Sequence, residues 1–278
     1  MKKTESRNAI LKTKVTSVLF AGMTTMFAMG AISCGQAEKT QSSIKVTNGV
    51  EIDASENPSV VLLYINNQGV CTGTFVNDYQ VVTAAHCVDR VSSVVILEKV
   101  SGRFKQREKY VSYKKHPKYT SPDQSKYDVA VVNFPKGTSE ETSLLSPKSP
   151  SAGEKFSIVG YGNNVIEDEL VGNQIQQSGS TVKRKGKNKI DSIEDGLILF
   201  EGDRKTFPTS TPGINSAAAG GDSGGPMFNN KGEIIGLTSH GKIFVEKSDK
   251  TKISKIITAY VDVNSEYVAS FLEEELGL

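Results

Sequence analysis

Three short segments of the chain carry residue types that can perform nucleophilic catalysis together. His86 ends a β-forming run, Asp128 stands at the head of an apolar run, and Ser223 lies among glycines. A serine hydroxyl is a weak nucleophile at neutral pH, so it needs a neighbouring base to take its proton. Histidine, with an ordinary pKa of about 6.5, suits this task when a buried carboxylate orients its ring. The three residues therefore predict hydrolysis through a covalent intermediate on serine.

In this order, the segments resemble those of the trypsin-like serine protease family. The resemblance runs from Val46 to about Leu272. The motifs that carry it are Cys71-Thr72-Gly73-Thr74, Val82-Thr83-Ala84-Ala85-His86-Cys87, Tyr127-Asp128-Val129-Ala130 and Gly221-Asp222-Ser223-Gly224-Gly225-Pro226. The resemblance implies a serine endopeptidase with His86, Asp128 and Ser223 as its triad. It also implies protein or peptide substrates, and no metal or other cofactor.

The resemblance assigns roles to the surroundings of the triad as well. In the family, the backbone amides that match Gly221 and Ser223 form the oxyanion hole, each such donor being worth about 3 kcal/mol. The residues that match the substrate pocket are Ala217, Ser239, His240 and Gly241, and Ser239 would also hydrogen-bond Asp128. Cleavage after Lys or Arg needs a carboxylate at the pocket floor, because an unpaired buried charge costs several kcal/mol. Ala217 stands at this floor, so we expect a small or medium apolar residue before the cut.

Val46-Thr47-Asn48-Gly49 resembles the mature N-terminus of the family, and Lys45 directly precedes it. In the family, the freed amino group pairs with the acid before the catalytic serine, here Asp222. A cut after Lys45 would thus convert an inactive precursor into the enzyme. Because Ala217 does not favour Lys, a separate trypsin-like protease should make this cut. The alternative is that Lys45 is only a linker residue.

Two other functions compete with the peptidase. A protease homologue without catalytic activity could act as a binding module, although such proteins usually lose a triad residue. An esterase or lipase would share the Gly-x-Ser-x-Gly pattern around Ser223, but it would need the order Ser, Asp, His along the chain. His116 matches a surface segment of the family ahead of Asp128, and we expect it to be structural.

Residues 1–33 have the pattern of an export signal, with a basic start and an apolar stretch from Val15 to Ile32. The stretch ends in Ala31-Ile32-Ser33-Cys34, which resembles a bacterial lipoprotein signal with Cys34 as the lipidated residue. Cleavage near Ala37 without a lipid and an uncleaved membrane anchor are the alternatives. Residues 34–45 read as a propeptide or linker, and 46–278 as the trypsin-like serine protease domain. We expect an exported protein, either lipid-anchored in the cell envelope or secreted.

The chain has three cysteines, Cys34, Cys71 and Cys87. Export to an oxidising compartment permits Cys71 and Cys87 to pair, and the short loop that they close is worth about 3 kcal/mol in the chain-entropy model. Cys34 is then the odd cysteine of an exported protein, which calls for an explanation. Lipidation supplies one.

The charge of the chain argues against nucleic acid as a partner. The formal charge of +2 comes from the N-terminal segment, since residues 46–278 hold 26 basic and 29 acidic residues. A slightly acidic body gives no general electrostatic attraction to nucleic acid. The one basic cluster lies at 183–189, contains glycine and asparagine, and is expected to be a solvated loop rather than a binding patch.

The body reads as short β-forming runs separated by turn residues, which predicts an all-β fold. The expected strands are Val60–Ile65, Val70–Asn77, Gln80–Ala84, Val94–Leu97, Val129–Phe134, Phe156–Tyr161, Leu197–Phe200, Pro226–Phe228 and Glu233–Ser239. Residues 136–153 read as a connection between two halves, and Ser265–Leu276 has a helical period. The family resemblance implies two six-stranded antiparallel β-barrels, with the active site between them and the helix packed on the second.

Overall fold

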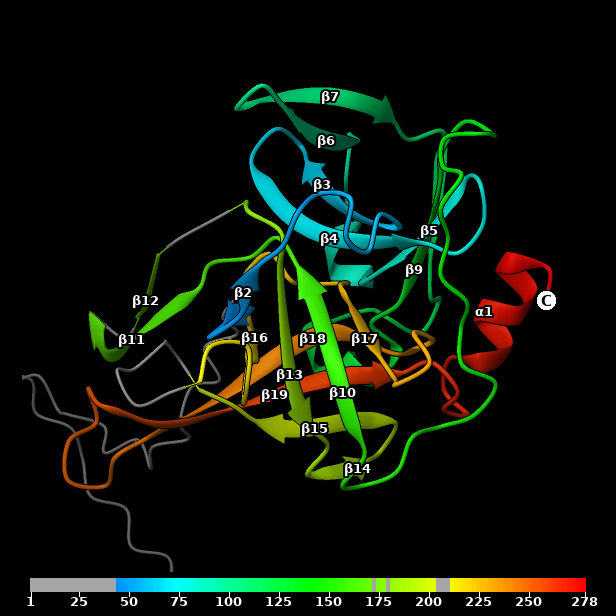
Figure 1. The fold of residues 1–278 in the computed structure, drawn as a ribbon. Helices are drawn as coiled ribbons and strands as arrows, with labels where there is room; N and C mark the ends of the chain where they lie inside the picture. Colours follow the sequence, from blue (N-terminus) through cyan, green and yellow to red (C-terminus); the bar gives the residue numbers. More distant parts are fainter. Residues whose placement is uncertain (1–43, 172–173, 179–180, 204–210) are drawn as a thin grey trace, which may run out of the picture. The chain divides into compact units, whose positions relative to one another are not determined.

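The computed structural model describes residues 44–171, 174–178, 181–203 and 211–278. All of them belong to one structural unit, residues 39–278. The described residues form antiparallel β-sheets and one α-helix near the C-terminal end (Figure 1). The predicted export signal and Cys34 lie outside the described residues. Within the described part, no helix is long and apolar enough to span a membrane.

The first large sheet contains seven strands from the N-terminal half of the body. In spatial order they are β7 (Arg103–Lys109), β6 (Val94–Val100), β3 (Val60–Ile65), β4 (Gly69–Phe75), β5 (Gln80–Thr83), β9 (Ala130–Asn133) and β8 (Ser112–Lys115). A tight turn joins β3 to β4, and Asn66 and Asn67 take positive φ there, which asparagine tolerates better than most residues. The core of this half is apolar and includes Leu63, Phe75 and Val132.

The second large sheet contains eight strands. In spatial order they are β14 (Ser192–Glu194), β15 (Leu197–Glu201), β19 (Ile253–Asp262), β18 (Ile234–Val245), β17 (Pro226–Phe228), β10 (Lys155–Gly160), β13 (Arg184–Lys189) and β2 (Val50–Glu51). Two small sheets accompany it, one of β1 (Ile44–Thr47) with β16 (Ala217–Ala219), the other of β11 (Val165–Val171) with β12 (Gln174–Ser178). Phe156, Phe200 and Tyr260 pack together in the core of this half.

A third apolar cluster joins the two halves. It combines Val82 and Val131 of the first sheet with Val159 and Val261 of the second. The C-terminal helix α1 (Ala269–Leu276) adds Phe271 and Leu272 to the same cluster. The halves therefore share a buried core, which fixes the residues of one half against those of the other.

The all-β fold with two antiparallel sheets and a C-terminal helix is confirmed, as are all nine expected strands to within a few residues, apart from the longer β18. The sheets hold seven and eight strands where six each were predicted. The difference comes partly from strands that the sequence analysis missed, among them β7 and β19. Residues 136–153 contain no strand and connect β9 to β10, as expected. The helix begins at Ala269 instead of Ser265, and it contacts β9 and Gln80 of the first sheet, where packing on the second half was predicted.

The prediction of a solvated loop at 183–189 was wrong. Residues 184–189 form strand β13, and both Lys183 and Arg184 are buried. The ammonium of Lys183 donates to the carbonyls of Ala54, Glu56 and Asn57 at 3.0–3.1 Å, and burial lowers its pKa to about 8. A run of basic residues therefore need not form a loop, because backbone carbonyls elsewhere in the chain can accept hydrogen bonds from a buried lysine such as Lys183.

Candidate active site

His86 lies just after the end of β5, a strand of the first sheet. It is the middle residue of a short 3₁₀ helix, η1 (Ala85–Cys87), that follows β5 directly. Ala85 and Cys87 on either side are buried, whereas 30% of the His86 side chain is exposed. The flanking residues thus anchor the helix in the core and leave the imidazole with access to solvent.

Asp128 lies beside His86 and is 2% exposed. It follows the 3₁₀ helix η2 (Pro122–Tyr127) and precedes β9. Its Oδ1 accepts the backbone N–H of His86 at 2.9 Å, and its Oδ2 lies 2.7 Å from His86 Nδ1. Two contacts with one residue fix both the position and the ring orientation of the histidine, which leaves Nε2 as the free ring nitrogen.

The pKa values of this pair are shifted in opposite directions. Burial lowers the pKa of His86, but the charge of Asp128 and the hydrogen bond to it outweigh burial, so the pKa lies above 6.5. Burial raises the pKa of Asp128, but the charge of His86 and the hydrogen bonds from His86 and Ser239 outweigh it, so the pKa lies below 3.8. Asp128 is therefore ionised at neutral pH, and it stabilises an imidazolium when His86 takes up a proton.

Ser239 provides a further hydrogen bond to the carboxylate. Its hydroxyl donates to Asp128 Oδ2 at 2.6 Å, as the sequence predicted. In the pairing of β18 with β19, Thr238 lies opposite Tyr260 and His240 lies opposite Ala259, so Ser239 is the extra residue of a β-bulge. A bulge redirects a side chain out of the regular alternation, and here it turns Ser239 toward Asp128.

Ser223 lies in a sharp loop that only glycines allow. Gly221 has a φ of +103° and Gly224 a φ of +75°. A Cβ on Gly224 would lie 2.0 Å from the hydroxyl oxygen of Thr83 and 2.5 Å from the backbone nitrogen of Ala84. The loop is therefore pressed against the strand end that leads into His86, and Ser223 itself is 3% exposed.

Thr72 on β4 links this loop to both halves of the molecule. Its backbone N–H donates to the carbonyl of Ser223 at 2.9 Å, and its hydroxyl donates to the carbonyl of Gly221 at 2.7 Å. The same hydroxyl accepts the backbone N–H of Tyr161 at 3.2 Å, and the Thr72 carbonyl accepts the hydroxyl of Thr83 at 2.9 Å. Thr72 and Thr83 both lie in the motifs quoted above, but no local pattern in the sequence assigns either of them a role of its own.

Of the predicted triad, the structure brings His86 and Asp128 into direct contact and places Ser223 close by. The carbonyl oxygen of Ser223 lies 3.7 Å from the sulfur of Cys87, the residue that follows His86. Among the described residues, the Ser223 hydroxyl makes no hydrogen bond with His86. Such catalytic hydrogen bonds are often long without substrate and shorten in its complex. The catalytic role of Ser223 stays a prediction.

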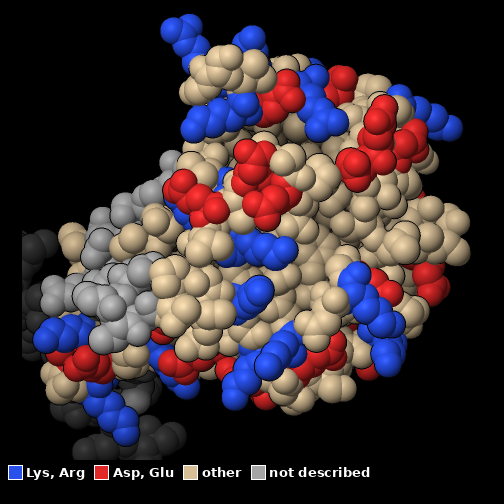
Figure 2. All heavy atoms as spheres, in the orientation of Figure 1, with Lys and Arg blue, Asp and Glu red and all other residues tan. Residues whose placement is uncertain are grey.

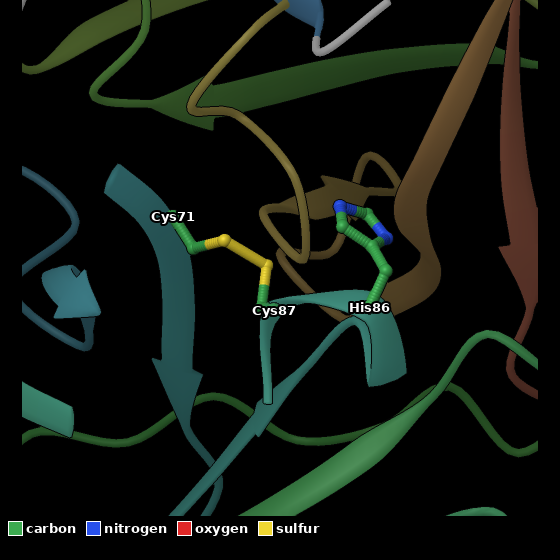
Figure 3. A group of neighbouring side chains, drawn as sticks. All are labelled: Cys71, His86 and Cys87. Carbon is green, nitrogen blue, oxygen red and sulfur yellow. A yellow bond between two sulfur atoms is a disulfide. The ribbon is translucent and has the colours of Figure 1, made fainter. Parts of the chain in front are cut away.

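The predicted disulfide joins Cys71 to Cys87, with the two Cα atoms 6.3 Å apart. Figure 3 shows this bond reaching from β4 to the short helix that carries His86. The two sulfurs and a His86 ring nitrogen lie within 4.8 Å of one another. They do not make a metal site, because disulfide sulfurs are not thiolates and His86 Nδ1 already contacts Asp128.

The residues predicted to line the substrate pocket lie on two strands in contact. Ala217 is on β16 and is 2% exposed, between the buried Ser216 and Ala218. Ser239, His240 and Gly241 follow one another on β18, which packs against β16. No carboxylate stands at Ala217 or at its two neighbours. Their role in substrate binding stays a prediction.

The predicted activation pair lies at the same strands. Val46 is on β1 and is 1% exposed, and β1 pairs with β16 so that Ile44 lies opposite Ala219. The carboxylate of Asp222, also buried, accepts the backbone N–H groups of Ala219 at 3.0 Å and Gly162 at 3.2 Å. The intact chain has no free amine at Val46, so the ion pair itself lies beyond this structure.

His116 was predicted to be structural and to lie in a surface segment, but the structure buries its side chain. It stacks on Tyr127 at 5.0 Å between ring centroids, and meets the ring of Phe271 edge-on at 5.0 Å. Burial lowers its pKa below 6.5. A neutral histidine packed between rings of η2 and α1 contributes to packing, and among the described residues it makes no hydrogen bond or ring contact with His86 or Asp128.

Comparison with known proteins finds similarity over the same part of the chain. Residues 46–267 match the family model described as Trypsin. A venom plasminogen activator of Gloydius brevicauda, Haly-PA, is 27% identical over 222 residues, covering 72% of this chain and 78% of its own. A bacterial protein described as an uncharacterized peptidase, from Corynebacterium glutamicum, is 26% identical over 234 residues, covering 84% of this chain and 73% of its own.

Solved structures support the fold. The structure described as HL collagenase matches with a TM-score of 0.60 at 18% identity, covering 84% of this chain and 99% of that chain. A Glu endopeptidase matches with a TM-score of 0.57 at 14% identity, covering 83% and 97%. At these identities, the two structures show only that the fold is shared. The chemistry of this chain is argued from its own site residues.

Proposed function

We propose that this chain, which belongs to the trypsin family of serine-type peptidases, is an endopeptidase that cleaves peptide bonds through an acyl-enzyme on Ser223. The observation that carries the proposal is the His86–Asp128–Ser239 arrangement. A buried carboxylate that accepts three hydrogen bonds fixes an imidazole with Nδ1 engaged and Nε2 free. A histidine held in this way suits a general base for a serine.

In the proposed first step, the Ser223 oxygen attacks the substrate carbonyl carbon while its proton passes to His86 Nε2. The proton then passes from His86 to the leaving amine, and the acyl group stays on Ser223. Water, activated by His86 in the same way, releases the acyl group and restores the serine. Asp128 keeps its negative charge throughout and stabilises the imidazolium.

The backbone N–H groups of Gly221 and Ser223 are proposed to bind the oxygen that becomes negative in the tetrahedral intermediate. Two observations support this role. Gly221 has a positive φ that a residue with a side chain rarely adopts, and its carbonyl is held by Thr72. A donor fixed before the reaction begins lowers the barrier without a reorganisation cost.

Ser223→Ala tests the proposal directly. The change removes one buried oxygen, so the variant should fold with an unchanged melting temperature while peptide hydrolysis is lost. A fluorophosphonate probe should label the parent chain on Ser223 and leave the variant unlabelled. The rival function, a binding module without catalysis, predicts no labelling of either protein, and undiminished turnover by the variant would exclude the assigned nucleophile.

We further propose that the enzyme is made as a precursor cut after Lys45. In the intact chain, the Lys45–Val46 bond lies in β1, which among the described strands pairs with the three-residue strand β16. Val46 is 1% exposed and packs in the core of the second half, so a protease reaches this bond only when β1 opens locally. The new amino group of Val46 would then lie beside β16, which ends at Ala219, three residues before Asp222. We propose that this amino group pairs with the buried carboxylate of Asp222.

The precursor hypothesis is tested by incubating the purified chain alone and with trypsin, then reading the N-terminus and the activity. A new N-terminus at Val46 should accompany the rise in activity, and Asp222→Asn should prevent that rise without preventing the cut. Full activity in a chain still joined at Lys45–Val46 would exclude activation at this site.

The proposed preference before the cut is a small or medium apolar residue. Ala217 and its buried neighbours offer no charge to meet Lys or Arg. Profiling with a peptide library tests this, and a profile dominated by Lys or Arg would require a carboxylate from elsewhere, such as Glu246 or Asp249. If the preference holds, the activating cut after Lys45 requires another, trypsin-like protease.

Attachment to a membrane through a lipid on Cys34, and location in the cell envelope or outside the cell, are proposals from the sequence alone. Mass spectrometry of the mature N-terminus tests them. A diacylglycerol on Cys34 supports the anchored form, and a free N-terminus near Ala37 supports the secreted one.

A further inference from the structure

The basic cluster that the sequence placed in a loop forms one wall of a hollow on the second sheet. Four lysines line it, Lys155 on β10 and Lys185, Lys187 and Lys189 on β13. The hollow has a volume of about 670 Å³, and no acidic residue is among those that line it. Figure 2 shows basic side chains following one another down the face that carries β10 and β13 in Figure 1.

Strand geometry places the four ammonium groups on one face. Lys185, Lys187 and Lys189 alternate along β13, so their side chains point to the same side about 6.6 Å apart. Lys155 lies directly opposite Lys189 in the pairing of β10 with β13. Like charges directly opposite one another destabilise a sheet, so the pair of Lys155 and Lys189 costs some stability.

The four lysines lack acidic partners. None of them forms an ion pair with a described residue, and only Lys185 makes a side-chain hydrogen bond, to the amide oxygen of Asn57 at 3.3 Å. Glu233 adjoins the hollow but is bonded to Asn229 at 2.7 Å. A concentration of unpaired positive charge is notable in a body that holds 26 basic and 29 acidic residues.

Protection of a sheet edge does not explain these lysines. Strand β7 shows what such protection looks like, because it is the edge strand of the first sheet and carries Arg103, Lys105 and Lys109 in exposed positions. Charges there prevent another strand from pairing with the edge. Strand β13 instead has β10 along one side, and on the other side β2 pairs with Arg184 and Lys185 while the segment 213–216 bonds the backbone of Lys187.

We propose that this hollow, which we call the lysine groove, is an exosite that binds an extended acidic peptide segment of the protein substrate. The assignment of the segment to a substrate rests on the proposed peptidase function. In an extended peptide, alternate side chains repeat at the same spacing as the lysines of β13. Carboxylates at alternate positions can therefore each meet one ammonium group.

The other groups of the lysine groove fit a peptide better than a nucleic acid. The side chains of Asn215 and Asn230 make no hydrogen bond to a described residue and can bind peptide N–H and C=O groups. Single-stranded nucleic acid needs exposed aromatic rings on which its bases stack. The two aromatic residues of the groove, Phe156 and Phe228, are both 3% exposed and offer no such surface.

Fluorescence anisotropy of the full chain carrying Ser223→Ala measures this binding without cleavage of the probe. The probe is a labelled peptide of alternating Glu and Thr residues, and the same peptide with Lys in place of Glu serves as its charge control. The triple substitution K185Q/K187Q/K189Q should weaken binding of the acidic peptide at least tenfold. The matched triple R103Q/K105Q/K109Q on β7 removes the same charge and should change binding less than twofold.

Equal losses in the two triple variants would reduce the effect to the overall charge of the protein and overturn the lysine groove. An oligothymidylate that competes for the groove and binds more tightly than the acidic peptide would overturn the choice of ligand. No binding of the acidic peptide to the parent chain would overturn the proposal outright. None of these results depends on turnover, so a failure of the peptidase assignment is recognised separately by the fluorophosphonate labelling of Ser223.

Discussion

Replacing Thr72 with valine removes one hydroxyl and keeps the shape of the side chain. In the structure, this hydroxyl donates to the carbonyl of Gly221 and accepts the N–H of Tyr161, at a position without solvent access. The substitution therefore leaves two backbone groups without partners, one of them in the loop that carries Ser223. We expect losses both in stability and in catalysis.

The size of the stability loss follows from the two unpaired groups. An unsatisfied buried donor or acceptor costs about 1–3 kcal/mol, and Tyr161 is only partly buried, so the free energy of unfolding should fall by about 2–4 kcal/mol. For a domain of this size, that corresponds to a melting temperature lower by about 10 °C. Loss of one oxyanion-hole donor lowers kcat by about 10²–10³. Because Thr72 acts through Gly221, we expect a smaller fall in kcat of about 10–100-fold, with KM nearly unchanged.

Steady-state kinetics with a chromogenic peptide, far below the melting temperature, measures the loss in kcat. Thermal unfolding measures the loss in stability. Thr72→Ser keeps the hydroxyl and should recover most of kcat. Thr74→Val is the matched control on the same strand, because the buried hydroxyl of Thr74 has no partner in the described structure. If Thr72→Val kept full kcat, or if Thr74→Val reduced it as much, the hydroxyl would not position the loop.

Three further outcomes follow from the site. Because the pKa of His86 is raised and the base must be neutral, kcat/KM should fall as the pH drops through a value above 6.5. Asp128→Asn removes the charge that raises the pKa of His86. In a pH–rate profile, the acid-side fall in kcat/KM should therefore move to a pH below 6.5, and kcat should be lower by about 10⁴-fold. Gly224→Ala should abolish activity and leave little folded protein by circular dichroism, because a Cβ would lie 2.0 Å from a hydroxyl oxygen. Replacing both cysteines of the Cys71–Cys87 disulfide by alanine should lower the free energy of unfolding by about 3 kcal/mol in denaturant titration, and an unchanged midpoint would show that the bridge adds no stability.

The chemistry of the site was predictable because it depends on residue types in short motifs. The hydrogen bond from Ser239 to Asp128 followed from the family resemblance, and the structure contains it. The bulge that makes this bond possible was not predictable, because it depends on the register of β18 against β19, and β19 was not recognised. Register between strands is set by long-range packing, which a single sequence does not display.

The role of Thr72 and the course of 183–189 show the same limit. Thr72 contacts residues about 90 and 150 positions further along the chain, so no local pattern marks its hydroxyl as special. The basic run predicted a solvated loop because charges usually face water. In the structure, the backbone carbonyls of Ala54, Glu56 and Asn57 accept hydrogen bonds from Lys183. The remaining lysines of the run lie at alternate positions on one side of β13. Such partners become visible only when distant segments are brought together.

The last turn of α1 has a consequence for the order in which the site can be completed. The amide of Gln80, on the strand that leads into His86, donates to the backbone carbonyl of Glu275 at 2.9 Å, three residues from the C-terminus. Phe271 and Leu272 fill the core between the halves from the same helix. During synthesis, Gln80 therefore gains the Glu275 carbonyl as a partner only after a further 195 residues have been made. Until then, the strand that leads into His86 lacks its contact with the helix, so the core between the halves cannot finish packing early in synthesis.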